Sequence, residues 1–200
     1  MVVVSVFFTM STINMVQTSI PMFLPRLEER KLTDLQQNLS HEDLKKLSKT
    51  ELVRLWHSLP APKLSTVSGF YDGRIACVGP LHPVSRFLTH NLFGPGSWAG
   101  KQLYPRKQMG ENIFITRRVP TGRRVKSQAF KMQIERSVLD KKPALVFDYH
   151  ESGVRNSFPW STMRDEVREI RPGILLGIGG MGATLGNLNS AIFTLERNRR

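Results

Sequence analysis

The chain has 200 residues, of which 40% are hydrophobic and 22% are charged, a composition that suits a globular core and excludes an intrinsically disordered chain. Its formal charge of +13 indicates attraction to anions such as acidic lipid headgroups, nucleic acid or an acidic substrate. The one cysteine, Cys77, excludes an intramolecular disulfide and favours a reducing compartment.

Residues 1–30 are expected to form a weakly ordered N-terminal extension. Their apolar stretch is interrupted by Ser5 and Thr9, no basic residue precedes it, and it is far shorter than the ~20 residues of a membrane span. These features argue against a signal peptide or an anchor. We therefore expect a cytoplasmic protein, and the alternative is an organellar or secreted protein with an atypical N-terminal segment.

Residues 31–60 are predicted to be helical and to pack on the outside of the domain. Ser48 and Glu51 have the spacing of a capping box, which marks a helix start. Leucine and tryptophan residues then repeat over 52–59 at the i, i+3, i+4, i+7 spacing of one helix face, and Pro60 ends the pattern. A helix that binds a partner is the alternative interpretation.

Residues 66–197 are predicted to form a mainly β domain, an antiparallel barrel of about eight strands. Phe130, Met132 and Ile134 alternate with polar residues, which is the period of a half-buried strand. No long helical segments lie between the strands, so a βαβ fold is excluded and a barrel or sandwich is favoured. The expected strands cover residues 70–78, 98–104, 112–118, 130–135, 144–149, 166–170, 174–178 and 191–196.

A short helix is predicted near residues 83–92. Pro83 suits the first turn of a helix, and Val84, Phe87 and Leu88 follow at helical spacing. This helix would lie across one mouth of the barrel. It is either a lid over a cavity or a plug that completes the core.

The glycine-rich segment 177–182 matches the G-x-G-x-x-G pattern of dinucleotide sites. Only 18 residues follow Gly182, too few for the second strand and helix that such a site requires. We interpret the glycines as positions of strand curvature and expect no cofactor. No metal site is expected either, because the five histidines lack paired ligand spacing.

Basic residues flank a predicted hairpin turn at 119–122. Positive charge at a loop tip can contact phosphate, but no aromatic residues are interleaved for base stacking, so nucleic acid is an unlikely partner. An acidic membrane surface explains the charges equally well, and a solvated hairpin is the simplest interpretation. The candidate surface anion site comprises Arg117, Arg118, Arg123, Arg124 and Lys126.

Charged residues also interrupt apolar strands at 148–151 and 164–168. Alternate residues of a strand face opposite sides, so Arg164, Glu166 and Arg168 share one face and Asp165 lies on the other. We expect one of these sets to point inward, where a carboxylate needs a basic partner. Such a network either binds the polar end of a ligand, holds an acid or base with a perturbed pKa, or is a structural ion-pair network.

Trp98 stands in the segment G-S-W-A-G-K at 96–101. This segment resembles the Gly-x-Trp of lipocalins and, more closely, a largely uncharacterised group of small lipocalin-like proteins named for a G-x-W-x-G motif. The resemblance extends over residues 52–196 and implies a barrel that encloses a small, largely apolar molecule. Its further pieces are G-F-Y-D-G at 69–73, V-F-D-Y at 146–149, D-E-V-R at 165–168 and P-G-I-L-L-G at 172–177.

Three functions follow as hypotheses. The first is a carrier or sensor of an apolar ligand whose contacts would be Trp98, Lys101, Tyr149, Arg164 and Arg168. The second is a small barrel enzyme, an isomerase or cyclase of an apolar metabolite, whose acid or base would be Asp148, His150 or Glu166. The third is a basic surface that binds nucleic acid or an acidic membrane. A cavity carboxylate without a basic partner would favour the enzyme, and neutralised carboxylates would favour the carrier.

The position of Lys101 sets a condition on the binding hypothesis. Lys101 lies three positions after Trp98, so the two side chains face opposite sides of an ideal strand. Both can line the same interior only if a β-bulge lies between them.

Overall fold

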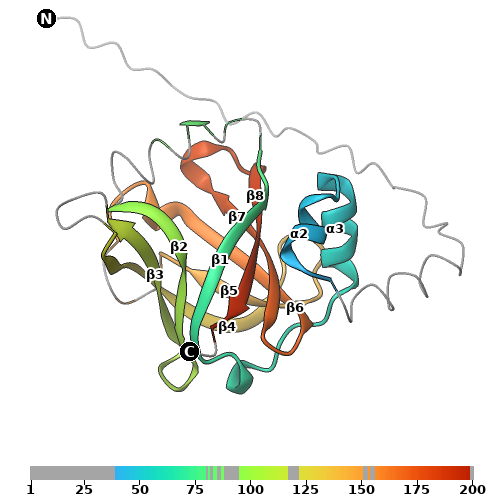
Figure 1. Ribbon diagram of the computed structural model, residues 1–200, viewed down its shortest axis with the longest axis horizontal. Coiled ribbons are helices and arrows are strands. Elements are labelled where there is room, and N and C mark those ends of the chain that lie inside the picture. Colours follow the sequence, from blue (N-terminus) through green and yellow to red (C-terminus); the bar gives the residue numbers. More distant parts are fainter. Residues whose placement is uncertain are drawn as a thin grey trace, which may run out of the picture.

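The eight strands of the computed structural model close into one antiparallel barrel in which each strand pairs with its neighbours in the chain and β8 pairs with β1 (Figure 1). The structure describes residues 39–79, 81, 83–84, 87, 95–116, 122–150, 153 and 156–198. The predicted fold class is confirmed, and each expected strand overlaps one observed strand. The strands are β1 (Gly69–Cys77), β2 (Gly96–Tyr104), β3 (Met109–Thr116), β4 (Arg124–Arg136), β5 (Pro143–Asp148), β6 (Met163–Arg171), β7 (Ile174–Met181) and β8 (Gly186–Arg197).

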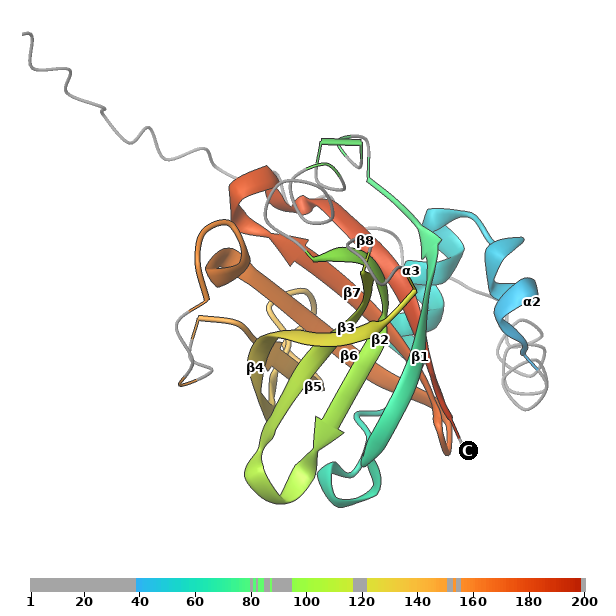
Figure 2. The same cartoon turned by 60° about the vertical axis from the view of Figure 1, so that its left-hand side comes forward.

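The connections between strands divide the barrel into two ends, seen at the bottom and top of Figure 2. At one end, which we call the closed end, strands are joined by the short segments 105–108, 137–142 and 172–173. The other end, which we call the open end, has the connections 78–95, 117–123, 149–162 and 182–185. Short 3-10 helices lie in or before these segments: η1 (Leu64–Thr66), η3 (Pro105–Lys107), η4 (Trp160–Thr162) and η5 (Gly182–Thr184).

Apolar side chains fill the half of the barrel near the closed end. They come from seven strands and all have 1% exposure or less, which corresponds to a close-packed interior. Any site inside the barrel is therefore placed toward the open end. These side chains are Tyr71, Leu103, Met132, Leu145, Val167, Leu175 and Leu195.

Two helices, α2 (His41–Lys45) and α3 (Lys49–Ser58), lie against the outside of the barrel (Figure 1). Each begins with a capping box, the predicted pair of Ser48 with Glu51 and a second pair of Ser40 with Asp43. The apolar face of α3 packs on the outer faces of β6, β7 and β8. The contacting cluster includes Leu52, Leu55, Trp56, Ile170, Leu176, Ile178 and Ile192.

Arg168 of β6 fastens α3 to the barrel wall. Its guanidinium is fully buried, forms two bonds of 2.7 and 2.8 Å with the carboxylate of Asp140, and lies 3.9 Å from the ring centroid of Trp56. It also donates hydrogen bonds to the carbonyls of Trp56, His57, Lys142 and Pro143. The side chain therefore satisfies the C-terminal carbonyls of α3 and the turn after β4 together.

The glycines of segment 177–182 lie in strand β7 and in the turn that follows it, and they open no α-helix. A Cβ on Gly177 would lie 2.3 Å from the ring of Phe193, and one on Gly179 would lie 2.5 Å from a carboxylate oxygen of Asp165. These glycines thus leave space for larger side chains of neighbouring strands.

Three sequence predictions fall wholly or mostly outside the described residues. They are the extension over 1–30, the helix near 83–92, and the hairpin turn at 119–122. Among the helices that the structure does describe, none has the length and apolar character needed to cross a membrane.

Candidate functional site: the Lys101 cluster

Lys101 points into the barrel because β2 contains a bulge. The register between β2 and β3 shifts between Trp98 and Gly100, so the ideal alternation is broken there and both Trp98 and Lys101 face inward. Gly100 has φ of +145°, and a Cβ at this position would lie 2.0 Å from the carbonyl oxygen of Tyr71. Only glycine fits this backbone position, and the bulge therefore depends on it.

The ammonium group of Lys101 uses all three of its hydrogens inside the barrel. Its Nζ donates to Asn112 Oδ1 at 2.8 Å and to the Tyr149 hydroxyl at 2.5 Å, and it forms an ion pair with Asp165 Oδ2 at 2.8 Å. The side chains of Lys101 and Asp165 are each 2% exposed. A buried charge is tolerable only with such partners, and here every donor has one.

The other members of the cluster complete the network. The Tyr149 hydroxyl donates to Asp165 Oδ2 at 3.1 Å and accepts from Asn112 Nδ2 at 2.8 Å. The indole of Trp98 donates to Asn112 Oδ1 at 3.0 Å. We call Trp98, Lys101, Asn112, Tyr149 and Asp165 the Lys101 cluster.

Aromatic rings surround the ammonium group. Five ring centroids lie between 4.8 and 5.7 Å from Lys101 Nζ, a distance at which the electron-rich ring faces attract a cation. Together with Asp165 they replace part of the hydration that the ammonium loses. The rings belong to Trp98, Phe130, Phe147, Tyr149 and Phe193.

Burial sets the proton affinities of the cluster. Desolvation lowers the pKa of Lys101 from its usual 10.5, while the charge of Asp165 and the hydrogen bond to it act in the opposite direction. Desolvation and the charge of Asp165 raise the pKa of Tyr149 well above 10. The phenol therefore stays protonated and donates to Asp165.

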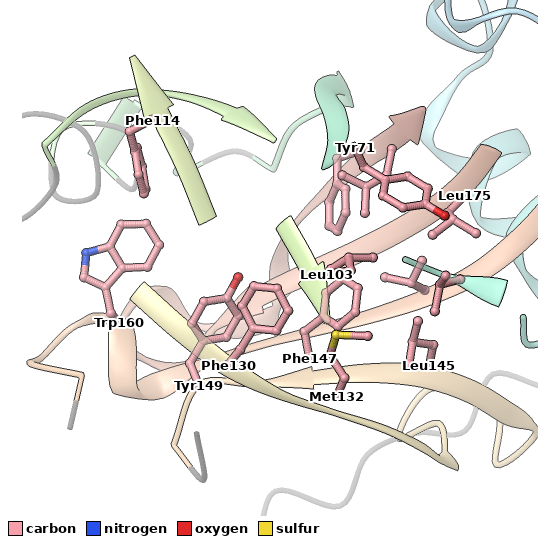
Figure 3. Packing of buried hydrophobic residues seen from close by; sticks show 14 residues of the cluster. Tyr71, Leu103, Phe114, Phe130, Met132, Leu145, Phe147, Tyr149, Trp160 and Leu175 are labelled. Carbon is pink, nitrogen blue, oxygen red and sulfur yellow. The ribbon is translucent and has the colours of Figure 1, made fainter. Parts of the chain in front are cut away.

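Two aromatic side chains cover the cluster on the side of the open end. Phe114 and Trp160 meet edge to face with centroids 5.7 Å apart, and Figure 3 shows them on the far side of Tyr149 from Tyr71 and Leu175. The Nε1 of Trp160 is buried and has no hydrogen-bond partner among the residues that the structure describes. A buried donor without a partner is uncommon and calls for an explanation.

Arg164 and Arg168 do not share the interior with Trp98, Lys101 and Tyr149. Both lie on the outer face of β6, whose inward face carries Asp165 and Val167. The alternation predicted from the sequence is present, and the inward set is the one with Asp165.

The three candidate acid or base groups lie outside the Lys101 cluster. The guanidinium of Arg164 pairs with Glu166 at 3.2 Å, with Glu135 at 2.8 Å and with Asp148 at 3.8 Å. His150 is exposed beyond the end of β5. Among the described residues of β6, the carboxylate that enters the barrel is that of Asp165. The pattern placed it on the face opposite Arg164 and Glu166, but it was not among the candidates.

The candidate surface anion site is described in part. Arg117 and Arg118 fall outside the described residues, and Arg123 is exposed. Arg124 lies 3.7 Å from a carboxylate oxygen of Asp72, and Lys126 donates to the hydroxyl of Tyr104 at 2.6 Å. Part of this positive charge is therefore engaged within the protein.

The described part of the chain offers neither a large surface pocket beside α2 nor a metal site. A pocket of about 80 Å³ lies between α2 and the outer wall, well below the volume of a site for a drug-sized ligand, ~300 Å³ or more. Within the described ranges, no three histidine, cysteine, aspartate or glutamate side chains gather in a way that could hold a metal ion.

Comparison with known proteins supports the fold alone. No family model matches the chain, and no curated protein matches it. A solved structure, of a protein from Thermomonospora curvata, superposes with a TM-score of 0.52 at 15% sequence identity and covers 76% of this chain and 89% of its own. At this identity the likeness shows a shared barrel and says nothing of a ligand or reaction.

Proposed function

We propose that the protein binds one small, largely apolar molecule in the open half of the barrel, as a carrier or sensor. The observation that carries the proposal is a closed barrel whose buried aromatic rings surround a polar cluster toward one end. Because side chains fill the closed half, the ligand would enter from the open end. There Trp98, Val125 and Met163 are only partly buried.

The pairing of the carboxylates favours binding over catalysis. A general base needs a lone pair within reach of the substrate proton. Asp165 is engaged by Lys101 at 2.8 Å. Glu166 accepts from Arg164 at 3.2 Å through Oε1, and its Oε2, buried with no partner among the described residues, lies on the outer face of β6, away from the barrel interior. This arrangement gives no specific support to an isomerase or cyclase.

The buried indole N–H of Trp160 supports a ligand that carries a hydrogen-bond acceptor. The three N–H groups of the Lys101 ammonium all have partners within the cluster, whereas Trp160 Nε1 has no partner among the described residues. A ligand oxygen that accepts from Trp160 would remove the cost of this buried N–H. The proposed ligand is therefore an apolar chain or ring with a carbonyl or ether oxygen.

The bulge supports a place in the G-x-W-x-G group. The first glycine of the motif, Gly96, has φ of +153°, and the second, Gly100, forms the bulge that turns Trp98 and Lys101 inward. If the motif glycines have these roles throughout the group, the motif tryptophan and the residue after the second glycine would both face inward in its other barrels.

Ligand uptake can be tested with a matched pair of tryptophan variants. Fluorescence of N-phenyl-1-naphthylamine would report binding, and displacement by 2-dodecanone and by dodecane would be compared. We expect 2-dodecanone to displace the probe better by about fivefold, the effect of roughly one hydrogen bond. Trp160→Phe should abolish this preference.

Trp56→Phe is the control, because Trp56 Nε1 is also buried without a described partner but belongs to α3, outside the barrel. It should keep the preference for the ketone. Failure of the unmodified protein to bind the probe, together with no apolar molecule in an organic extract of natively produced protein, would overturn the proposal.

A further inference from the structure

We infer that the open end of the barrel docks on an anionic membrane surface. This goes beyond the proposed ligand binding, since it concerns the rim rather than the interior. Most of the exposed large hydrophobic side chains that the structure describes lie at this end. They are Val78, Leu81, Val84, Phe87, Ile115, Phe158, Leu185 and Leu188.

These residues belong to one rim although they come from different connections. The backbone N–H of Leu81 donates to Asn189 Oδ1 at 2.8 Å, which joins the segment after β1 to the start of β8 beside Leu188. The N–H of Ala183 donates to Thr162 Oγ1 at 3.1 Å, which joins the turn after β7 to the segment that carries Phe158. Figures 1 and 2 both show the turn after β7 and the segment after β1 at the same end.

Leu185 is the clearest sign that the rim contacts something apolar. Its φ is +68°, a left-handed conformation that favours glycine or asparagine, and its side chain is 61% exposed. Three residues on, Leu188 is 79% exposed. The fold gains nothing from a leucine at such a position, so burial of these side chains against another surface accounts for them better.

The charge of the same connections complements an acidic surface. Of the basic residues at this end that the structure describes, Arg123, Arg124 and Lys126 are exposed at the start of β4, and the last two also contact Asp72 and Tyr104. Exposed aliphatic side chains next to basic ones are the combination that binds anionic lipid headgroups and inserts below them. Nucleic acid would use the arginines but not Leu185 and Leu188, because aliphatic side chains do not stack on bases.

Co-sedimentation of the full chain with vesicles tests the inference. We expect binding to vesicles of phosphatidylcholine with phosphatidylserine and much weaker binding to phosphatidylcholine alone. The double variant Leu185→Asn, Leu188→Asn should reduce partitioning at least about tenfold. Asparagine is chosen because it tolerates the left-handed conformation of residue 185, so the fold is kept.

The control is Ile134→Asn, Val138→Asn, which removes two exposed apolar side chains away from the open end, 42% and 47% exposed. It should bind vesicles like the unmodified chain. Equal loss in both double variants would overturn the inference, and so would unchanged binding in the Leu185, Leu188 variant. Tighter binding to a DNA duplex than to vesicles, insensitive to the leucines, would overturn it in favour of nucleic acid.

Discussion

Two buried ion pairs lie on opposite sides of the same barrel wall, and they differ in what else their cations hold. Lys101 and Asp165 pair at 2.8 Å inside the barrel, and the remaining donors of Lys101 go to side chains. Arg168 and Asp140 pair at 2.7 Å outside it, and Arg168 also holds the carbonyls of helix α3 and of the turn after β4. The outer pair therefore connects backbone segments, whereas the inner pair connects only side chains.

This difference assigns the two pairs different roles. Buried ion pairs often stabilise a protein no more than apolar residues of similar volume would. The inner pair could be replaced without leaving a backbone group unpaired, so the requirements of the fold do not explain it. The outer pair differs, because the carbonyls of Trp56 and His57 would each lose a buried charged donor and keep only the bonds from Leu59 N–H and Lys142 Nζ. We therefore assign Arg168 to the fold, and this contrast supports the Lys101 cluster as the site of the proposed ligand binding.

The largest expected effect is that of Arg168→Met. It removes both guanidinium bonds to the Asp140 carboxylate, which keeps only His57 and the Lys142 N–H, and it removes the charged donor to several carbonyls. The free energy of unfolding should fall by about 3–5 kcal/mol. Urea denaturation measures this. Arg136→Met, at an exposed position at the end of β4, should stay within about 0.5 kcal/mol of the unmodified chain. A similar small loss for Arg168→Met would contradict the role of this side chain in holding α3.

Variants that neutralise both partners of an ion pair distinguish the roles of the inner and the outer pair. Lys101→Met alone should cost about 3–5 kcal/mol because Asp165 is left buried and charged. Adding Asp165→Asn should recover most of that loss, since the amide oxygen still accepts from Tyr149. Arg168→Met with Asp140→Asn should recover little, because the bonds from the guanidinium to the backbone carbonyls are not restored.

Denaturation of the four variants under one set of conditions measures both recoveries. If the second substitution restored the free energy of unfolding as fully at the outer pair as at the inner one, the proposed difference between the pairs would be wrong. If neither recovered, the Lys101 cluster would also be a structural necessity.

The local pattern predicted all eight strands because the alternation of apolar and polar residues in a strand can be seen in consecutive residues of the sequence. It also predicted that Asp165 and Arg168 lie on opposite faces of β6. It could not decide which face points inward, since both carry charges and the burial of Arg168 depends on helix α3, more than a hundred residues earlier in the chain.

The Lys101 cluster was predicted only in part for a related reason. Lys101 and Tyr149 were candidates, but Asn112 and Asp165 were not. Six of the nine residues of β6 are charged, so the sequence alone does not distinguish Asp165 from its neighbours. Four strand registers and one bulge bring these residues together, and register is set by pairing over the whole barrel rather than by local sequence.

The smallest expected effect concerns the pH dependence of the outer pair. Burial raises the pKa of Asp140, but hydrogen bonds from Arg168 and His57 outweigh it and hold this pKa below its usual 3.8. A carboxyl whose pKa is lowered by folding contributes stability above its unfolded pKa and loses it as the pH falls through the folded value. The difference in unfolding free energy between the unmodified chain and Asp140→Asn should therefore be constant near neutral pH and shrink below about pH 4. In the Arg168→Met background the same comparison should be nearly flat, because the main donor to Asp140 is gone. A difference that persists undiminished to the lowest pH at which the chain folds would show that the charge of Asp140 does not stabilise the junction of α3 with the barrel.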